Sequence, residues 1–571
     1  MSNRGVMEAY EHWLADPAID AQTKLELQAL AGAHQEIEDR FFRDLEFGTG
    51  GLRGVMGAGT NRMNRYTVGR AAQGLAAYVR SLKGHQGAVV IAYDSRHQSP
   101  AFALESALVM AGNGVKAYLF ESLRPTPELS YAVRHLGATA GIVITASHNP
   151  PEYNGFKAYG PDGGQLVPAA AERVMAEIAA LTSLHDIRRM PQGDAETAGL
   201  LEWIGDNVDY HYINAVVGIS PNPGMVQAAL AEGVSLSVVY TPLHGSGNLP
   251  VRAVLAKAGF KDVTVVPEQE HPDPEFSTVA SPNPEERAAF TLALQLAEQT
   301  GAELLLGTDP DCDRVGAVVK DAQGQYVVLT GNQTGAIIAE YLLSSHAARG
   351  TLPPRPVVIK TIVTSELGAA VAEHYGATVL NTLTGFKYIG ERMTEFERTG
   401  AFDFIFGYEE SYGYLAGTYA RDKDAVVASL LVAEAAVHYK QQGMTLYDVL
   451  QRLYARHGYY LEALQSRTLK GKDGLALMTS LMDAWRTASP QAVAGIGVAS
   501  RMDYMQDVHG LPLENVLKFV LEDGSWFCLR PSGTEPKIKM YFAVKADMLA
   551  QAQQRLDQIM SDVMERIDSS I

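Results

Sequence analysis

Short apolar runs alternate with helix-like segments along most of the chain. The apolar runs predict strands at 88–93, 141–145, 236–241, 263–267, 303–307, 357–361 and 402–407. Segments rich in helix-forming residues lie before and between them, among them 7–44, 101–111, 285–299 and 334–346. Short buried strands that alternate with helices are typical of parallel sheets covered by helices. The pattern therefore predicts α/β units.

Several predicted strands end in a polar or glycine-rich loop, and this arrangement recurs along the chain in three related units. After about residue 454 the pattern changes to strands at 516–521, 526–529 and 538–544, followed by a terminal helix at 546–567. We therefore expect three related α/β domains plus a smaller C-terminal α+β domain. The predicted domain boundaries are 1–204, 205–324, 325–453 and 454–571.

The amino-acid composition limits the cellular compartments and the classes of binding partner that fit this chain. Of the 571 residues 47% are hydrophobic and 20% are charged, and no run of about 18 uncharged apolar residues predicts a membrane span. Residues 1–13 lack the apolar core of a signal peptide. The two cysteines, Cys312 and Cys528, exclude a disulfide framework and indicate a cytoplasmic protein. The net charge of -18 argues against nucleic acid as a partner, and no obligate protein partner is evident.

The first chemical motif is Thr-Ala-Ser-His-Asn-Pro-Pro at 145–151, directly after a predicted buried strand. Its serine, Ser147, would be exposed at the strand end and restricted by the prolines that follow, as suits a nucleophile. Lys157 follows in the next segment and could return to the same site to stabilise the charge of a phosphoryl group. An ordinary polar turn, with His148 as a capping residue, explains the same sequence.

The second motif is Gly-Thr-Asp-Pro-Asp-Cys-Asp-Arg at 307–314. The carboxylates of Asp309, Asp311 and Asp313 alternate along the chain and can converge on one hard cation, Mg²⁺ or Ca²⁺. An EF-hand is excluded, because Arg314 stands where its invariant glycine belongs. A solvated acidic turn is the alternative, and the apolar run just before the motif disfavours it.

Two further loops offer groups for a phosphorylated sugar. Arg-Pro-Ser-Gly-Thr-Glu-Pro-Lys at 530–537 combines a guanidinium, two hydroxyls and loop amides that could hold a phosphate. Carboxylate, hydroxyl and aromatic groups at 407–413 follow a predicted strand and suit sugar hydroxyls. Each loop is also compatible with an ordinary turn. The glycine-rich segment 48–54 is neither a GxGxxG motif nor a P-loop, so nucleotide binding has no support.

In this order and spacing, the segments TASHNPPEYNGFK, GTDPDCDR, GYEESYG and RPSGTEPK resemble the motifs of the α-D-phosphohexomutase superfamily. The resemblance covers about residues 47–544. The segments GTGGLRG, TPLHGSG, SPNPEE and RPSGTEPKIKMY resemble its phosphoglucomutase/phosphopentomutase type-2 branch. This resemblance implies four domains around a central active-site cleft, of which three are related α/β domains and the last is a smaller α+β domain.

The resemblance also implies roles for individual residues. Ser147 is similar to the family's phosphoserine, and its phosphate oxygen is expected to bind the metal ion together with Asp309, Asp311 and Asp313. The other expected catalytic residues are Arg53, His148, Lys157 and Lys423. The expected substrate-binding residues are Arg314, Gly385, Phe386, Lys387, Glu409, Ser411, Arg530, Ser532, Gly533, Thr534 and Lys537. Tyr412 stands where some relatives carry a histidine, which favours Lys423 as the acid/base group on that side.

The activity that the resemblance implies is the interconversion of α-D-glucose 1-phosphate and glucose 6-phosphate. It would proceed through a 1,6-bisphosphate, with one Mg²⁺ per subunit and glucose 1,6-bisphosphate as activator. Lys157 would accept the hydroxyl proton, which requires neighbouring cations to lower its pKa. Pentose 1-phosphates, mannose 1-phosphate and bisphosphate synthesis are the alternatives within this branch.

Two hypotheses outside the sugar-phosphate mutases are a phosphatase and a non-catalytic sensor. Residues 311–315 also fit the D-x-D-x-[TV] pattern of aspartyl-phosphate phosphatases, with Asp311 as the nucleophile. That pattern would normally follow the first strand of its domain, and here it lies far behind the serine motif. A non-catalytic sugar-phosphate sensor would be expected to lack Ser147 or the aspartates, and this chain retains them.

Overall fold

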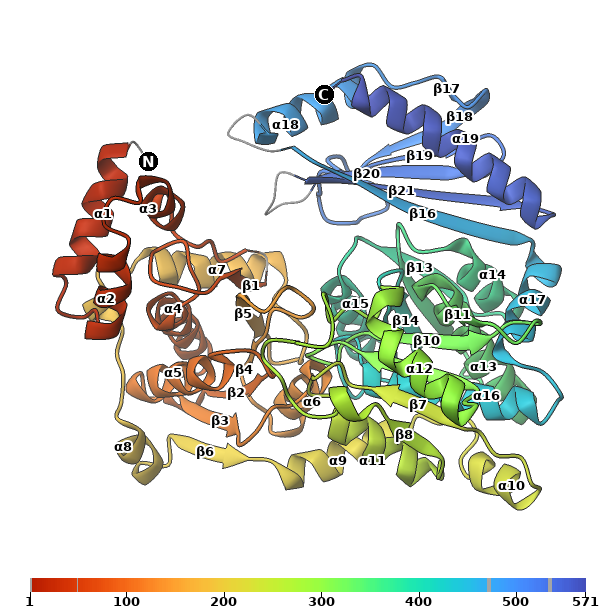
Figure 1. Ribbon diagram of the computed structural model, residues 1–571, viewed down its shortest axis with the longest axis horizontal. Coiled ribbons are helices and arrows are strands. Elements are labelled where there is room, and N and C mark those ends of the chain that lie inside the picture. The colour runs from red at the N-terminus through yellow and green to blue at the C-terminus, as the bar shows by residue number, and fades with distance from the viewer. Residues whose placement is uncertain (1–2, 49, 470–473, 532–536, 571) are drawn as a thin grey trace.

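The computed structural model describes residues 3–48, 50–469, 474–531 and 537–570 (Figure 1). Three helix-covered sheets form the body of the molecule, and a fourth sheet with its own helices stands beside them. The expected fold class, three α/β domains plus a C-terminal domain, is confirmed. Among the described helices none has both the length and the apolar character needed to cross a membrane.

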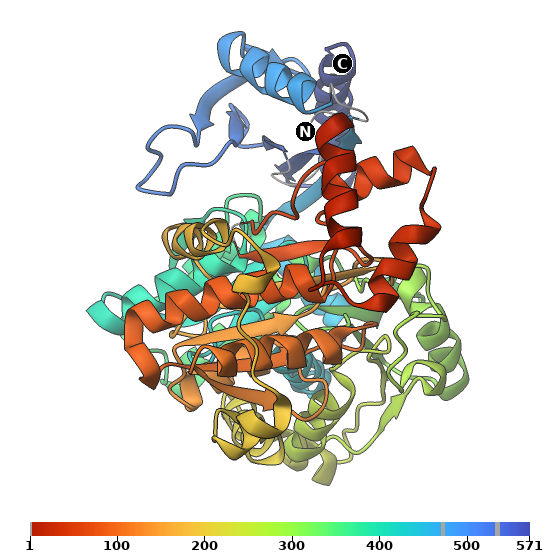
Figure 2. The ribbon, with the colours of Figure 1, turned by 90° about the vertical axis from the view of Figure 1, so that its left-hand side faces the viewer.

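The predicted N-terminal helical stretch forms three helices on the outer side of the first sheet (Figures 1 and 2). They are α1 (Asn3–Ala15), α2 (Ala21–Ala29) and α3 (His34–Phe41). The Asp20 carboxylate caps α2 by accepting the backbone N–H of Thr23 at 2.9 Å. The Trp13 ring packs edge-on against Phe41 and Tyr66, with centroids 5.7 and 5.5 Å away. Because Tyr66 belongs to the next helix of the chain, these rings attach the stretch to the first α/β unit.

The first sheet has the strand order β1-β5-β4-β2-β3-β6. Its strands are β1 (Gly51–Val55), β2 (Ala88–Tyr93), β3 (Lys116–Phe120), β4 (Ala140–Ile144), β5 (Tyr153–Tyr159) and β6 (Leu201–Ile204). Its helices are α4 (Arg65–Lys83), α5 (Ser99–Gly112), α6 (Thr126–His135), α7 (Pro168–Ala179) and α8 (Gln192–Thr197). β4, β2, β3 and β6 are parallel, as predicted, whereas β5 runs antiparallel to β4 and β1. The serine motif is therefore the loop that joins β4 to β5.

The second sheet has the order β11-β10-β9-β7-β8 and the third the order β13-β12-β14-β15. Their strands are β7 (Val238–Thr241), β8 (Val263–Val265), β9 (Leu304–Thr308), β10 (Val315–Lys320), β11 (Tyr326–Val328), β12 (Pro356–Thr361), β13 (Thr378–Thr382), β14 (Asp403–Glu409) and β15 (Gly413–Ala416). β11 pairs with β10, so the second sheet extends beyond the predicted boundary at residue 324.

The helices of these two units are α9 (Asp206–Val217), α10 (Met225–Ala231), α11 (Asn248–Ala258), α12 (Thr291–Thr300), α13 (Gly331–Arg349), α14 (Glu366–His374), α15 (Phe386–Thr399), α16 (Ala425–Lys440) and α17 (Leu446–His457). Nearly every residue of α16 is buried, as expected for a helix that is apolar all round. The hydrophobic core in which α16 is buried also contains Tyr212, Val238 and Val358 from α9, β7 and β12. The second and third units therefore share one core, which fixes their loops relative to each other.

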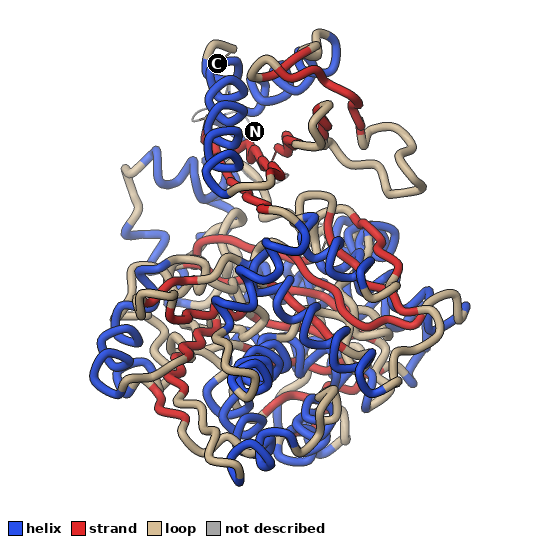
Figure 3. The backbone as a smooth tube through the Cα atoms, turned by 90° about the vertical axis from the view of Figure 1, so that its right-hand side faces the viewer, coloured by secondary structure: helices blue, strands red, loops and turns tan. Residues whose placement is uncertain are grey.

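The fourth unit is an antiparallel sheet of order β16-β21-β20-β19-β18-β17, and it lies at the top of the view in Figure 3, above the other three units. Its elements are β16 (Tyr459–Thr468), α18 (Gly474–Thr487), β17 (Ala492–Val493), β18 (Ile496–Asp503), β19 (Leu517–Leu521), β20 (Trp526–Pro531), β21 (Lys537–Ala546) and α19 (Leu549–Asp568). Buried Lys518 lies over the Trp526 ring and donates to the backbone oxygen of Ile362 at 2.6 Å. This bond ties the fourth sheet to the third unit.

Stability should depend on pH through Glu434 of α16, a carboxyl remote from the loops described below. Its side chain is 3% exposed and accepts the hydroxyl of Tyr341 at 3.0 Å, and burial raises its pKa from 4.5 to about 7. Between pH 4.5 and 7 the unfolded chain loses this proton while the folded chain keeps it, so stability falls as the pH rises. Relative to wild type, Glu434→Gln should gain about 3 kcal/mol across this window.

Thermal unfolding of wild type and Glu434→Gln, followed across the same pH window, checks this expectation. Glu298→Gln, at an exposed position of α12, is the matched control and should track the wild type throughout. Parallel curves for wild type and Glu434→Gln would contradict the assignment.

Candidate active site

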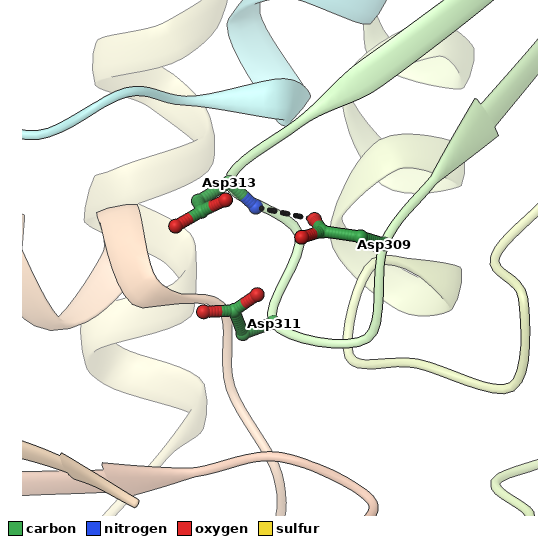
Figure 4. Close-up of side chains that lie close together, drawn as sticks. All are labelled: Asp309, Asp311 and Asp313. Carbon is green, nitrogen blue, oxygen red and sulfur yellow. Dashed lines mark hydrogen bonds between the residues drawn. The ribbon is translucent and has the colours of Figure 1, made fainter. Parts of the chain in front are cut away.

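Three aspartates converge in the loop that follows β9. One carboxylate oxygen from each of Asp309, Asp311 and Asp313 lies within 4.8 Å of the other two, and all three side chains are buried (Figure 4). The backbone N–H groups of Asp313 and Arg314 donate to Asp309 Oδ1 at 3.1 and 3.0 Å, which holds the turn. Cys312 points into the core of the second and third units instead of into this group. The predicted convergence of the three carboxylates is therefore present.

The electrostatics of this group suit a bound cation. Burial and the neighbouring carboxylates raise the pKa of Asp309 well above its usual range. Asp311 Oδ1 and Asp313 Oδ1 are buried and have no hydrogen-bond partner among the described residues. Carboxylate oxygens that lack a proton donor are the ligands that hard divalent cations take. The three side chains could therefore hold a metal ion of this kind.

The loop between β4 and β5 places Ser147 against the aspartate loop. Ser147 adopts a φ of 53°, a conformation that is unusual for a residue with a side chain and that recurs at functional sites. Its Oγ donates to Asp309 Oδ2 at 2.8 Å and lies 3.2 Å from His148 Nδ1. Thr145 Oγ1 accepts the Ser147 backbone N–H at 2.8 Å and fixes the turn. The serine and metal motifs, distant in sequence, thus form one site.

Two lysines lie against the same carboxylates. Lys157 Nζ lies 2.7 Å from Asp311 Oδ2 and 3.3 Å from Asp313 Oδ2, and Lys423 Nζ lies 2.9 Å from Asp313 Oδ2. The sequence-based expectation of a lowered Lys157 pKa is wrong for this arrangement. Burial favours the neutral amine, but Asp311 and Asp313 outweigh burial and raise the pKa of Lys157. Both lysines are ammonium groups here, since the pKa of Lys423 is raised as well.

The other basic residues expected near the serine differ in their surroundings. Arg53 of β1 is exposed and donates to Asn149 Oδ1 at 3.0 Å. Burial, reinforced by Arg314 and Arg53, lowers the pKa of His148 to about 2, so its imidazole is neutral. Arg314 pairs with Glu285 and lies 3.8 Å from Asp313. Arg53 is therefore the most accessible of these cations.

The loops expected to recognise the sugar meet at Glu409, the last residue of β14. Its Oε1 accepts the backbone N–H of Gly385 at 2.9 Å, and burial raises its pKa to about 7. Ser411 is half-buried in the turn that follows. The expectation that Phe386 contacts substrate is not met by its side chain. That ring is 3% exposed and packs in a core with Ile389, because it begins the apolar face of α15.

A basic cluster surrounds the end of β20. Arg530 donates to Glu514 Oε1 at 3.0 Å. Burial, with a smaller contribution from the Arg530 charge, lowers the pKa of Lys387. Ser532, Gly533 and Thr534 lie outside the described residues, and Lys537 begins β21. Lys539, which the sequence analysis missed, stands opposite Arg530 in the sheet. Burial and the neighbouring Arg530 charge lower the pKa of Lys539, as expected for cations that lie close to one another. The alternation Lys-Ile-Lys at 537–539 could have indicated that Lys539 lies on the same face of the strand as Lys537.

Arg96 is a second residue that the sequence analysis missed. It follows β2 and is 1% exposed. Its guanidinium donates to the backbone oxygens of Ser147 at 2.5 Å, Pro150 at 2.7 Å, Tyr153 at 3.1 Å, and to that of Asn149. One planar cation therefore fixes four carbonyls of the serine loop. The Asp-Ser-Arg triplet directly after a predicted buried strand could have indicated that Arg96 lies near the site.

Arg96→Lys should loosen this loop, because a single ammonium cannot contact four carbonyls at once. We expect faster amide hydrogen exchange at 145–153 and a stability loss of about 2 kcal/mol. Hydrogen exchange read by mass spectrometry checks both the rate and its location. Arg173→Lys, at an exposed site over the Tyr78 ring, is the control and should change neither. Unchanged exchange at 145–153 in Arg96→Lys would contradict the positioning role.

Comparisons with known proteins agree with this geometry. The phosphoglucomutase/phosphomannomutase alpha/beta/alpha domains I, II and III match residues 44–185, 211–324 and 330–457, and the C-terminal domain of that family matches 482–560. The chain is 38% identical to a Staphylococcus haemolyticus phosphoglucomutase over 531 residues, 90% of this chain and 93% of that protein. A Staphylococcus aureus phosphoglucomutase is 36% identical over 538 residues, 91% of this chain and 94% of the relative.

Solved structures share the fold at lower identity. The open form of Paramecium parafusin, a phosphoglucomutase, superimposes with a TM-score of 0.69 at 17% identity, covering 92% of this chain and 95% of that chain. A phosphoglucomutase/phosphomannomutase family protein of Burkholderia thailandensis gives 0.67 at 19% identity, covering 92% and 97%. The domain matches and the identity over nine-tenths of the chain decide the family. The chain belongs to the phosphoglucomutase/phosphomannomutase family, within the α-D-phosphohexomutase superfamily.

Proposed function

We propose that the protein is a phosphoglucomutase, an isomerase that interconverts α-D-glucose 1-phosphate and glucose 6-phosphate by phosphoryl transfer. The observation that carries this proposal is the 2.8 Å contact between Ser147 Oγ and Asp309 Oδ2, which joins a nucleophile to a group of three carboxylates. The phosphoglucomutase relatives at 36–38% identity support glucose as the sugar. Ser147 carries the phosphoryl group between turnovers.

Substrate binding uses the loops of the third and fourth units. Arg530, with the loop residues Ser532, Gly533 and Thr534, holds the phosphate that is not transferred. Lys387, Lys537 and Lys539 add positive charge around it. Glu409, Ser411 and the backbone of Gly385 bind the sugar hydroxyls, while Phe386 anchors the start of α15. Arg314 fixes the aspartate loop through Asp313 and Glu285.

The first transfer breaks the bond between phosphorus and Ser147 Oγ and forms a bond from phosphorus to the sugar 6-oxygen. One Mg²⁺ per subunit, held by Asp309, Asp311, Asp313 and a phosphoserine oxygen, would neutralise charge on the transferring group. Arg53, whose side chain is exposed, stabilises the negative charge on the transferring phosphoryl group as well. Lys157, which lies against Asp311 and Asp313, is the group proposed to accept the hydroxyl proton; a cation held by these carboxylates would offset the negative charge that raises its pKa.

Glucose 1,6-bisphosphate, the product of this step and the activator, then reorients so that its 1-phosphate faces Ser147. The serine oxygen takes that phosphoryl group, and glucose 6-phosphate leaves. The sugar 1-oxygen takes up the proton that Lys157 accepted from the 6-hydroxyl, passed on through Lys423, the acid/base group near Asp313 and Glu409. Both lysines therefore end the cycle in the charge state in which they began it. Neutral His148, next to Ser147 Oγ, orients the serine oxygen and adds no charge to it.

The proposed sugar is tested by a coupled assay that offers glucose 1-phosphate, mannose 1-phosphate and ribose 1-phosphate with Mg²⁺ and the matching bisphosphate. We expect the highest kcat/KM for glucose 1-phosphate. A higher kcat/KM for mannose or ribose 1-phosphate would overturn the sugar assignment while leaving the phosphoserine chemistry in place.

A further inference from the structure

A segment of the second unit, residues 270–286, reaches the first unit beside the serine loop. We call it the bridging segment; all of its residues are described, and none lies in a helix or strand. Its Glu275 Oε1 lies 2.5 Å from His97 Nε2. The Arg96 guanidinium lies over the ring of Phe276, with Cζ 4.9 Å from the ring centroid. Because Arg96 fixes four carbonyls of the serine loop, Phe276 contacts the side chain that holds this loop.

Phe276 does not pack as an ordinary core phenylalanine. It is 1% exposed, yet it belongs to none of the clusters of buried apolar side chains that form the cores of the described units. Its φ of 48° lies in the left-handed region, which a bulky residue enters at a cost of about 1–3 kcal/mol. Two turns hold this conformation, since its N–H donates to Asp273 O at 3.1 Å and its carbonyl accepts the Val279 N–H at 3.0 Å. The backbone therefore presents the ring to Arg96.

The contact with the ring matters because Arg96 is a buried cation. Its side chain is fully buried, and its Nε lies 3.2 Å from Asp94 Oδ2. Burial lowers the pKa of Arg96, which means that removing its charge from water is costly. The negative face of an aromatic ring attracts a desolvated cation by about 2 kcal/mol. Phe276 therefore offsets part of the cost of burying Arg96 and limits where the guanidinium can lie.

The bridging segment is in turn fixed relative to the aspartate loop. His244, in the loop that follows β7, donates from Nδ1 to His271 O at 2.9 Å, and its Nε2 lies 2.8 Å from Thr278 Oγ1. In the same loop the backbone N–H and the hydroxyl of Ser246 donate to Pro310 O at 2.8 and 2.9 Å. One short loop thus holds both the bridging segment and the aspartate loop, so the two keep a constant relative position.

We propose that Phe276 is a positioning residue for Ser147. It holds Arg96 against the carbonyls of the serine loop and thereby keeps the serine oxygen at the aspartate loop. The effect on the serine loop is independent of the reaction, whereas the effect on catalysis rests on the proposed function. The two effects are measured separately, so failure of one is distinguishable from failure of the other.

The effect on the serine loop is tested with phenylalanines that carry one, two or three ring fluorines, placed at position 276 of the full chain. Fluorine withdraws charge from the ring face with little change of shape, so each added fluorine weakens the attraction for a cation. We expect amide hydrogen exchange at 145–153 to accelerate stepwise along the series, by about fivefold in total. Exchange that is the same throughout the series would overturn the positioning role.

The same series at Phe260 is the matched control. Phe260 is 6% exposed and packs in the apolar core of the second and third units. Fluorination there should leave exchange at 145–153 unchanged, because no step of the argument links this ring to Arg96. An equal acceleration from both positions would show a general loss of stability and would overturn the specific role of Phe276.

The effect on catalysis is measured in the same proteins with glucose 1-phosphate, Mg²⁺ and glucose 1,6-bisphosphate. We expect kcat to fall in step with the exchange, by about fivefold, while KM stays within about twofold, because Arg530 and Glu409 belong to other units. Phe276→Leu, which keeps an apolar side chain without a ring face, should lower kcat at least as far. If exchange responds along the series and kcat does not, the catalytic part is overturned and the structural part stands. Absence of mutase activity in wild type would instead refute the proposed function.

Discussion

Ser147→Ala should lower kcat by roughly 10⁴-fold or more, because the nucleophile that stores the phosphoryl group is removed. Binding of glucose 1-phosphate should persist, since Arg530 and Glu409, from other units, carry it in the proposed mechanism. The fold should also persist, because the loop keeps its bonds to Arg96 through the backbone oxygen of residue 147. Steady-state kinetics with glucose 1,6-bisphosphate present and calorimetric binding of glucose 1-phosphate measure the two effects separately.

Ser277→Ala is the matched control for this substitution. Ser277 is an exposed loop serine whose hydroxyl bonds Asp273, so its replacement should leave kcat within about twofold of wild type. A Ser147→Ala protein that turns over at a near-normal rate would show that the phosphoryl group is stored elsewhere.

Asp311→Asn should weaken Mg²⁺ binding by roughly a hundredfold, because it removes one negative ligand of a hard cation. Asp311 is fully buried, and its Oδ1 has no partner among the described residues. The amide also loses the ionic contact with Lys157 at 2.7 Å. We therefore expect kcat to stay low even when Mg²⁺ is raised to saturation. Calorimetric titration with Mg²⁺ gives the affinity for the ion, and activity measured over the same Mg²⁺ range gives kcat at saturation.

Asp194→Asn controls for the loss of one carboxylate. Asp194 is exposed in the first turn of α8, away from the aspartate loop, and its replacement should alter neither value. If Asp311→Asn bound Mg²⁺ as tightly as wild type, the assignment of the aspartate loop as the metal site would fail.

The alternation of apolar runs and helices was sufficient to predict the α/β units. The predicted strand 88–93 coincides with β2, and 303–307 corresponds to β9, because both are continuous buried runs. The antiparallel strands β1 and β5 were not predicted, since Gly, Asn and Lys interrupt their apolar pattern. The domain boundaries at 324 and 453 stay predictions; near them β11 pairs with β10, and α17 packs into the core shared by the second and third units. Strand pairing and helix ends depend on contacts that local sequence does not carry.

The sequence was sufficient to predict those parts of the candidate site whose residues lie close together along the chain. The three aspartates are close in sequence and converge in space, and Ser147 follows directly on a buried strand. The side-chain direction of Phe386 could not be predicted, because the packing of α15 on its sheet turns the ring inward. The charge state of Lys157 likewise depends on carboxylates of another unit. Properties set by neighbours distant in sequence appear only once the sheets are assembled.

In the proposed mechanism Ser147 carries the phosphoryl group between half-reactions. The most direct measurement is peptide mass spectrometry of the protein incubated with glucose 1,6-bisphosphate, before and after glucose 6-phosphate is added. We expect one phosphoryl group on the peptide that contains Ser147, stable to hydroxylamine and discharged to glucose 6-phosphate. A hydroxylamine-sensitive phosphoryl group on the peptide that contains Asp311, or a Ser147 phosphate that never transfers, would contradict it.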